Sequence, residues 1–235
     1  MSFFSRSVDK KLQKEHTITM KRSIFFLSFM LILSVTLFAQ NKPDALNLYR
    51  NGRDMEAIGR TEDAKTVYAQ AIEVCKQDLI DNPKNMDAYT IYGWSLVRLG
   101  KYQDSINICI EALKGNSDSR ITETLGESYF YLGNYKDSLK QMEKYIDAAP
   151  KGERISTAYF FAGEIYRMTK MFNRAEIAYS TAVFLEPSIS LWWYRLAVIR
   201  ETLGDKGRAT DAYQRALKLR PDYKEATDGL SRVRT

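Results

Sequence analysis

A small residue that recurs at long, regular intervals leaves few folds open to this chain of 235 residues. Successive intervals are 41, 33, 37 and 34 residues, between Gly52, Gly93, Gly126, Gly163 and Ala197. A period of this size is typical of repeat architectures, in which each unit stacks on its neighbours. No unit this short can bury its own apolar face, so the pattern predicts one continuous array of units.

Each unit reads as two antiparallel helices joined by a tight turn. A glycine, which ends a helix readily in the left-handed conformation, stands seven residues after most of the small residues: Gly59, Gly100, Gly133 and Gly204. Unit four has Lys170 there and departs from the pattern. More small residues follow in the second helix and let the two backbones approach closely: Ala64, Ser105, Ser138, Ala175 and Ala209. Units three to five close with a proline, which stops the second helix: Pro150, Pro187 and Pro221.

These residues resemble the tetratricopeptide repeat, a helix-turn-helix unit of about 34 residues. The fifth unit carries the resemblance through Trp193, Leu196, Gly204, Ala209, Tyr213, Ala216 and Pro221. The third carries it through Leu125, Gly126, Tyr129, Gly133, Tyr135 and Pro150. The resemblance covers roughly residues 45–223 and implies an all-α, right-handed superhelical solenoid of about five units.

The array is expected to occupy residues 40–223. Its units fall at about 45–82, 86–119, 119–152, 156–189 and 190–223. Unit one has extra residues before Asn82-Pro83, which predicts a longer second helix. Residues 224–235 are expected to form a closing helix with Ala226 and Leu230 facing inward. No room is left after residue 39 for a separate catalytic domain.

Residues 1–39 form an N-terminal extension that indicates export. Residues 24–38 carry no charge and directly follow Lys21 and Arg22. A helix of this length spans about 23 Å, short of the ~30 Å hydrocarbon core, which favours a signal peptide cleaved after Ala39. The alternative is an uncleaved membrane anchor. Translation is expected to start at Met20, and both alternatives place the body in the periplasm or cell envelope.

Charge and composition exclude several classes of function. The formal net charge of +6 lies largely in the extension, because residues from Gln40 onward hold 29 basic and 27 acidic side chains. This balance is a poor footprint for nucleic acid. The single histidine, His16, lies in the extension, so the body lacks the residue on which most acid–base and zinc chemistry depends. We expect no enzyme, no metal and no cofactor, with Cys75 and Cys109 as buried apolar residues rather than a disulfide.

The resemblance implies that the first helix of each unit lines a concave groove. Side chains three before and one after the small residue, and some one turn further on, then form the partner-binding groove: Tyr49, Arg53, Thr90, Trp94, Arg98, Glu123, Glu127, Tyr131, Phe160, Glu164 and Tyr194. The set is aromatic, with basic residues toward unit one and acidic residues in units three and four. Helical aromatic stripes also fill cores, so Phe160 could equally be interior, and Trp193 is expected to be structural.

The groove predicts a protein–protein interaction module that binds a peptide or helix of another envelope protein. The lysine and asparagine residues with which some members of this family grip a C-terminal carboxylate are absent at the matching positions, among them Tyr49, Arg53 and Ile91. The alternative is an accessory protein that holds a small apolar ligand or lipid inside the superhelix. Contact with a membrane is expected only if residues 24–38 remain uncleaved. Self-association of the chain is a further alternative.

Overall fold

The computed structural model describes residues 43–234, and in this range it holds eleven α-helices and no strand. The helices are α2 (Ala45–Ala57), α3 (Thr61–Asp81), α4 (Met86–Arg98), α5 (Tyr102–Ala112), α6 (Ser119–Tyr131), α7 (Tyr135–Ala148), α8 (Ile155–Met168), α9 (Phe172–Leu185), α10 (Ser190–Thr202), α11 (Lys206–Leu219) and α12 (Lys224–Arg234). The all-α helical repeat fold expected from the sequence is confirmed.

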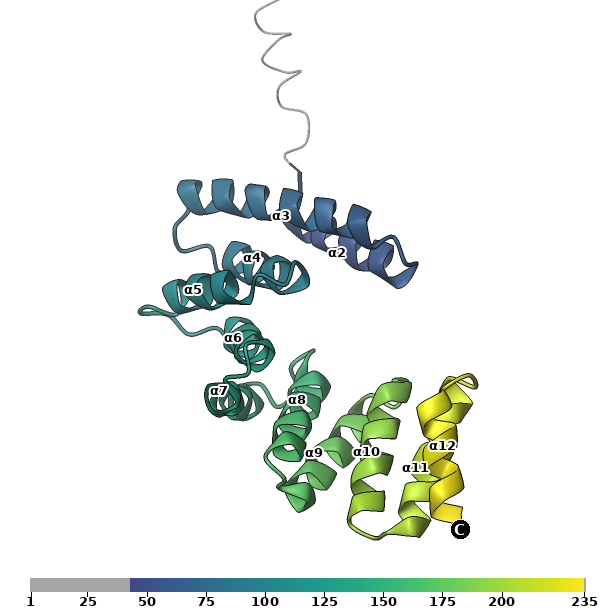
Figure 1. Ribbon diagram of the computed structural model, residues 1–235. Coiled ribbons are helices and arrows are strands. Elements are labelled where there is room, and N and C mark those ends of the chain that lie inside the picture. Colours follow the sequence, from purple (N-terminus) through teal and green to yellow (C-terminus); the bar gives the residue numbers. More distant parts are fainter. Residues whose placement is uncertain (1–42, 235) are drawn as a thin grey trace, which may run out of the picture. The chain divides into compact units, whose positions relative to one another are not determined.

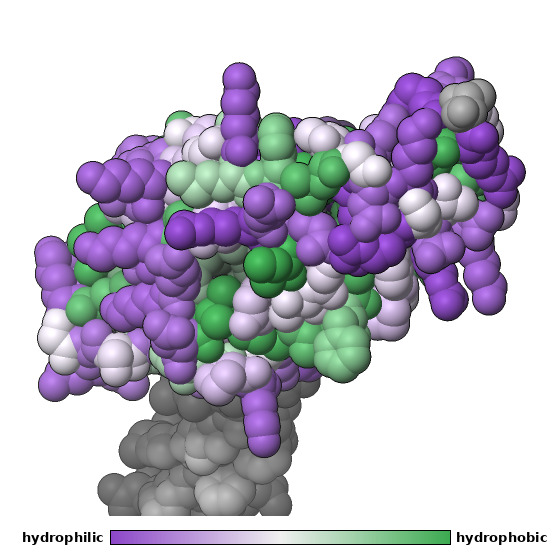
Figure 2. All heavy atoms as spheres, turned by 90° about the horizontal axis from the view of Figure 1, so that it is seen from below, coloured by the Kyte–Doolittle hydropathy of each residue, from purple (hydrophilic) through white to green (hydrophobic). Residues whose placement is uncertain are grey.

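Consecutive helices pack side by side in five pairs, and α12 closes the series against α10 and α11 (Figure 1). At 21 residues, α3 is the longest of the helices described and continues beyond the length of the other second helices. Hydrophilic side chains cover most of the face shown in Figure 2, with apolar side chains exposed between them. None of the helices described is both long enough and apolar enough to cross a bilayer. The predicted signal or anchor segment lies outside the described residues.

Tyrosine rings packed on glycine hold three of the helix contacts together. In unit one, a Cβ added at Gly52 would lie 2.5 Å from Tyr68 Cε1. In unit four, a Cβ added at Gly163 would lie 2.6 Å from Tyr179 Cδ1. Gly229 of α12 meets the ring of Tyr213 in the same way. All three rings are fully buried, so only glycine lets the facing backbone come this close.

Each of these tyrosines also donates a hydrogen bond to a glutamate on the first helix of its unit. Tyr68 Oη donates to Glu56 at 2.9 Å, Tyr179 donates to Glu164 at 2.5 Å, and Tyr213 donates to Glu201. Burial and the adjacent carboxylate raise the pKa of all three phenols.

An arginine from the next unit completes each tyrosine–glutamate pair. Arg98 of α4 lies 3.5 Å from Glu56, Arg195 of α10 lies 2.9 Å from Glu164, and Arg232 of α12 lies 2.8 Å from Glu201. The same three residue types therefore join two pairs of neighbouring units and attach the closing helix α12 to unit five. Because the glutamates are partly or fully withdrawn from water, these pairs are screened less than surface ion pairs.

The turns within the units follow one backbone geometry. Gly59, Gly100, Gly133 and Gly204 have φ between +71° and +80°. Lys170 takes the same position in unit four with φ +60°, the one non-glycine residue with positive φ in the described part of the chain. The turn is therefore formed even where the sequence departs from glycine.

Cys75 and Cys109 are free and buried, and burial raises the pKa of each thiol to about 12.

The ring-on-glycine contact can be tested by Gly163→Ala. The added methyl group has no space beside Tyr179, so we expect the free energy of unfolding to fall by about 1–3 kcal/mol in denaturant titration. Gly207→Ala in α11 is the control, because its Cβ would meet nothing closer than 3.9 Å. This variant should be neutral or more stable by up to about 1 kcal/mol. Equal stability of Gly163→Ala and wild type would contradict the packing argument.

Candidate functional site: an inner cavity of the helix array

A cavity of about 560 Å³ lies between the start of the array and its later units. One wall is formed by α2 and α4. The other is formed by the segment before α8, the start of α8, and the segment that leads into α10 together with the start of that helix. Arg120 of α6 also lines the hollow. Chain segments more than 100 residues apart, such as those around Tyr49 and Trp192, therefore line one hollow. Its volume lies in the range of ligand pockets, about 300–1,000 Å³.

Aromatic pairs stand on both walls of this inner cavity. On the α2–α4 wall, the rings of Tyr49 and Trp94 have centroids 5.3 Å apart. On the facing wall, Trp192 stacks on Phe160 with centroids 5.0 Å apart and ring planes 13° apart. Tyr49 and Trp192 are buried, whereas Trp94 keeps part of its surface open. The open part of Trp94 offers an apolar contact to whatever enters.

Unpaired charges of opposite sign line the two walls. Arg50 and Arg53 are exposed on α2 and form no ion pair within residues 43–234. Glu153 and Glu186 line the facing wall and likewise lack an ion-pair partner in that range. The other cations of the cavity are held internally. Arg120, for example, contacts Asp87 and Asp118 at 2.7 Å each.

A buried charge cluster adjoins the cavity where α6 meets the start of α8. Arg154 lies 2.7 Å from Glu123 and 2.6 Å from Glu127, so one guanidinium serves two carboxylates. Burial alone would lower the pKa of Arg154, but the two carboxylates outweigh it and raise that pKa. Glu123 is fully buried, and burial raises its pKa to about 7 against the opposing effect of Arg154.

The structure brings four of the predicted groove residues to the inner cavity: Tyr49, Arg53, Thr90 and Trp94. Two of them offer little to a ligand. Tyr49 is 5% exposed, and Thr90 is 1% exposed with its hydroxyl donating to the Met86 carbonyl at 2.8 Å. Arg53 and Trp94 are therefore the predicted residues that face the hollow with accessible surface.

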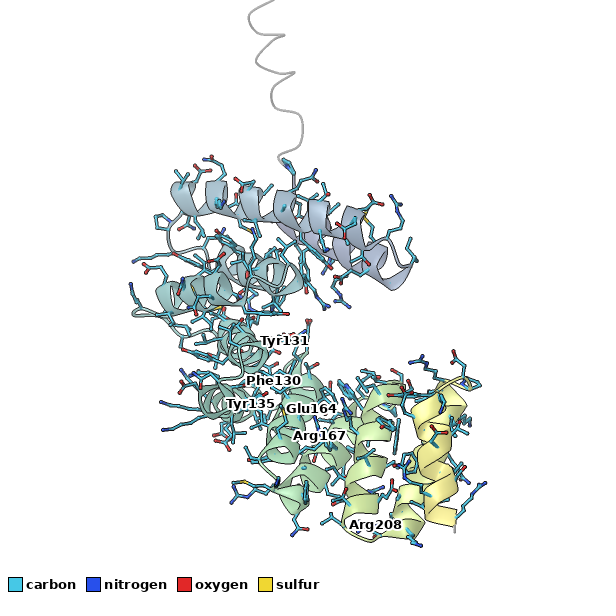
Figure 3. All side chains as sticks on the ribbon, viewed as in Figure 1. Phe130, Tyr131, Tyr135, Glu164, Arg167 and Arg208 are labelled. Carbon is cyan, nitrogen blue, oxygen red and sulfur yellow. The ribbon has the colours of Figure 1, made fainter. Side chains whose placement is uncertain are left out.

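The predicted acidic residues do not line the cavity. Glu123 is held by Arg154, and Glu127 shares that arginine. Glu164 is buried between Arg167 at 2.7 Å and Arg195 at 2.9 Å, and Figure 3 shows Glu164 and Arg167 together on α8. The acidic groove residues expected in units three and four are therefore paired with arginines inside the array.

Four further predicted residues also lie away from the cavity lining. Arg98 pairs with Glu56, and Phe160 lies behind Trp192. Tyr131, beside Phe130 at the end of α6 in Figure 3, stacks on Tyr102 with centroids 4.8 Å apart. Tyr194 contacts Tyr223 with centroids 5.0 Å apart. Trp193, expected to be structural, donates its Nε1–H to the Pro187 carbonyl at 2.9 Å.

Several lining residues were missed by sequence reasoning: Arg50, Arg120, Glu153, Arg154, Glu186 and Trp192. Glu153, Arg154 and Glu186 lie between helices, where repeat register assigns no direction to a side chain. Trp192 and Arg50 lie on first helices, and the turn of the array brings them inward. Within residues 43–234, no group of three or more histidine, cysteine or acidic side chains could hold a metal ion.

Two segments of the chain match family models. Residues 123–183 and 190–223 each match a model described as tetratricopeptide repeat. The chain therefore contains tetratricopeptide repeats, as the sequence indicated. Such repeats generally serve as non-catalytic modules for protein interaction, through the extended concave surfaces that stacked units create.

Curated relatives match only part of this chain. The mouse (Mus musculus) protein O-mannosyl-transferase TMTC1 is 31% identical over 97 residues, 41% of this chain and 10% of the relative. The human (Homo sapiens) protein of the same name is 28% identical over 110 residues, 46% of this chain and 12% of the relative. This chain thus spans about a tenth of their length, and the transferase named belongs to those whole proteins.

Solved structures share the fold over much longer stretches. TTC0263, a thermophilic TPR protein of Thermus thermophilus, gives a TM-score of 0.60 at 18% identity, covering 81% of this chain and 98% of its own. YrrB, described as a TPR protein with an unusual peptide-binding site, gives 0.53 at 18% identity, covering 84% and 97%. MamA gives 0.57 at 16% identity, covering 74% and 96%. At these identities the likeness concerns the fold.

The buried cluster predicts a pH dependence of stability that Glu123→Gln removes. Because the folded pKa of Glu123 lies above its unfolded value near 4.5, its contribution is fully present below pH 4.5 and lost as pH rises toward about 7. The stability of wild type relative to Glu123→Gln should therefore fall over this window by at least about 1 kcal/mol. Denaturant titrations at several pH values measure the difference, and a difference that is constant or rises with pH would contradict it.

Proposed function

We propose that the protein is an exported, non-enzymatic scaffold of the cell envelope whose inner cavity binds a peptide segment or helix of a partner protein. The observation that carries the proposal is the cavity itself. It combines partly open Trp94 and Arg53 on one wall with the carboxylates of Glu153 and Glu186 on the other, and none of these charges has an ion-pair partner within residues 43–234. An aromatic anchor with charged neighbours is the usual composition of an interface hot spot.

The charges support a directional mode of binding. Arg50 and Arg53 on α2 attract the acidic part of a partner segment, while Glu153 and Glu186 attract its basic part. Complementary charges of this kind set orientation and speed association more than they add affinity. Glu123 and Glu164, bound to arginines inside the array, take no part in this proposal.

A small apolar ligand or lipid is the second candidate, and the charged lining argues against it. Four charged side chains that form no ion pair within the described part of the chain would lose water on contact with an apolar molecule without gaining an ionic partner. Native mass spectrometry of gently purified protein distinguishes the two. A co-purified small-molecule mass that disappears in the Trp94→Ala variant would replace the peptide proposal with this one.

Export is the part of the proposal that rests on sequence alone, on the uncharged segment 24–38 after Lys21 and Arg22. Expression in a bacterial host followed by fractionation and intact-mass measurement tests it. We expect the protein outside the cytoplasm, with a mass that begins at residue 40 if the segment is a cleaved signal. Full-length protein found in the cytoplasm would contradict the proposed export and the proposed location in the cell envelope.

The double variant Trp94→Ala/Arg53→Glu tests the cavity. Loss of the aromatic anchor and reversal of the adjacent charge should weaken partner capture at least about tenfold, the effect of removing roughly 1.4 kcal/mol. Crosslinking and affinity purification from intact cells, followed by quantitative titration with the captured partner, gives the measurement.

Lys140→Glu is the matched control, because it reverses an exposed charge on α7 outside the cavity lining. It should bind like wild type, and both variants should keep the wild-type circular dichroism spectrum. Equal partner binding by the double variant and wild type would move the interaction to another surface.

A further inference from the structure

One buried carboxylate beside the inner cavity lacks the hydrogen bonds that such a group needs. Glu123 of α6 is fully buried, and neither of its carboxylate oxygens accepts a well-directed hydrogen bond within residues 43–234. Arg154 Nε lies 2.7 Å from Glu123 Oε2, so the contact is an ion pair without the alignment of a hydrogen bond. A buried carboxylate in such surroundings is costly to ionise. Glu123 therefore holds a proton readily, and its pKa of about 7 agrees with this geometry.

The arginine beside Glu123 is already engaged by another carboxylate. Arg154 Nη2 donates a hydrogen bond to Glu127 Oε2 at 2.6 Å. The single positive charge of the guanidinium therefore faces two carboxylates. We refer to Glu123, Glu127 and Arg154 as the buried cluster. It carries one net negative charge when both carboxylates are ionised and is neutral when Glu123 holds a proton.

Ionisable side chains face Glu123 from each helix packed against α6. The start of α8 contributes Arg154, and the others are Arg98 of α4, Cys109 of α5 and Tyr145 of α7. Arg98 is paired with Glu56 at 3.5 Å, and burial raises the pKa of both the Cys109 thiol and the Tyr145 phenol. None of these neighbours changes its charge near neutral pH, so the charge of this region there follows Glu123.

The buried cluster reaches the inner cavity through Arg154. The Arg154 side chain lines the cavity and is 26% exposed, whereas Glu123 and Glu127 do not line it. Glu153, the preceding residue, and Glu186 add two carboxylates to the same wall. A charge in a buried cluster is screened little by salt. Ionisation of Glu123 therefore makes this wall more negative, although Glu123 contacts nothing that enters the cavity.

We propose that the inner cavity binds a basic side chain of its partner more tightly when Glu123 is ionised, so that binding at this wall releases a proton from Glu123 to solvent. This inference rests on the proposed function of the cavity and adds a response to pH. A lysine or arginine near Glu153 stabilises the ionised cluster, and by linkage the ionised cluster stabilises the bound cation equally. Affinity for a basic segment should therefore rise with pH through the neutral range.

A short basic peptide tests the inference. Pentalysine blocked at both ends carries no group that titrates between about pH 5 and 8.5. In protein labelled with carbon-13 at glutamate carboxyl groups, NMR follows Glu123, whose signal is the one absent from Glu123→Gln. The free protein should show a pKa of about 7 for Glu123. Saturating pentalysine should lower that pKa by at least about half a unit, which corresponds to a limiting gain in affinity of about threefold.

The affinity for pentalysine gives a second measurement. Between about pH 6 and 8.5, the affinity of the wild type should rise at least about twofold. Glu123→Gln should show little change over the same range, because its amide does not ionise. Its affinity should match that of the wild type at the acid end, where Glu123 is protonated.

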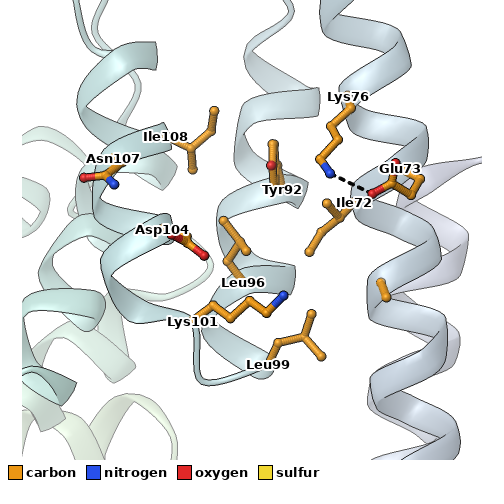
Figure 4. A pocket seen from close by; sticks show the side chains of 11 residues that line it. Ile72, Glu73, Lys76, Tyr92, Leu96, Leu99, Lys101, Asp104, Asn107 and Ile108 are labelled. Atoms are coloured by element: carbon orange, nitrogen blue, oxygen red, sulfur yellow. Dashed lines mark hydrogen bonds and ion pairs between the residues drawn. The ribbon is translucent and has the colours of Figure 1, made fainter.

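A second hollow supplies the matched control. It measures about 440 Å³, is formed by α3, α4 and α5, and offers other carboxylates to a basic peptide (Figure 4). There Glu73 pairs with Lys76 at 2.7 Å, and Asp104 is exposed on α5. Asp104→Asn also exchanges a carboxylate for an amide, but outside the inner cavity and the buried cluster. This variant should keep the pH dependence of the wild type.

Three results would overturn the inference. They are pentalysine that binds at no pH, pentalysine that binds and leaves the pKa of Glu123 unchanged or higher, and a Glu123→Gln variant with the pH dependence of the wild type. The proposed function is tested separately, by partner capture with Trp94→Ala/Arg53→Glu. If that double variant loses the partner while Glu123 does not respond to pentalysine, the scaffold function stands and the pH response is wrong.

Discussion

The array depends on contacts in which a large side chain of one helix rests on bare backbone of another. Tyr68 on Gly52 and Tyr179 on Gly163 leave no room for a methyl group. The same rings extend their hydroxyls to glutamates, and arginines of the following unit close the group. Packing within a unit and attachment to the next unit therefore rest on the same residues, as nearest-neighbour stability in a repeat protein requires.

The inner cavity results from how the ion pairs between units orient one helix pair against the next. Arg154, held by Glu123 and Glu127, fixes the segment before α8 against α6. This brings the starts of α8 and α10 opposite α2 and α4, and so places Trp94 and Trp192 around one hollow. Removal of a single carboxylate from a buried cluster leaves its partner poorly compensated, so the shape of the cavity depends on Glu123 and Glu127, which do not line it.

The predicted groove residues that line the inner cavity lie on the first helices near the beginning of the array. Arg53 and Trp94 were found from their offset to Gly52 and Gly93 alone. The same offset also gave Glu123 and Glu164, which lie against arginines away from the cavity lining. Repeat register fixes the direction of a side chain but not whether an arginine from elsewhere covers it. Glu153 and Glu186 lie between helices and have no register at all.

The sequence by itself determined the class of fold, the paired helices and their turns. Small residues at a fixed spacing let paired helices pack closely, and their repetition along the chain requires the pairs to stack. Even Lys170 forms the turn that glycine forms in four other units. Only the tertiary structure decided which charges stay free, which aromatic residues meet across the hollow, and that unit four presents Ile177 and Phe184 to the outside. Those properties depend on neighbours distant in the chain, and periodicity carries no information about them.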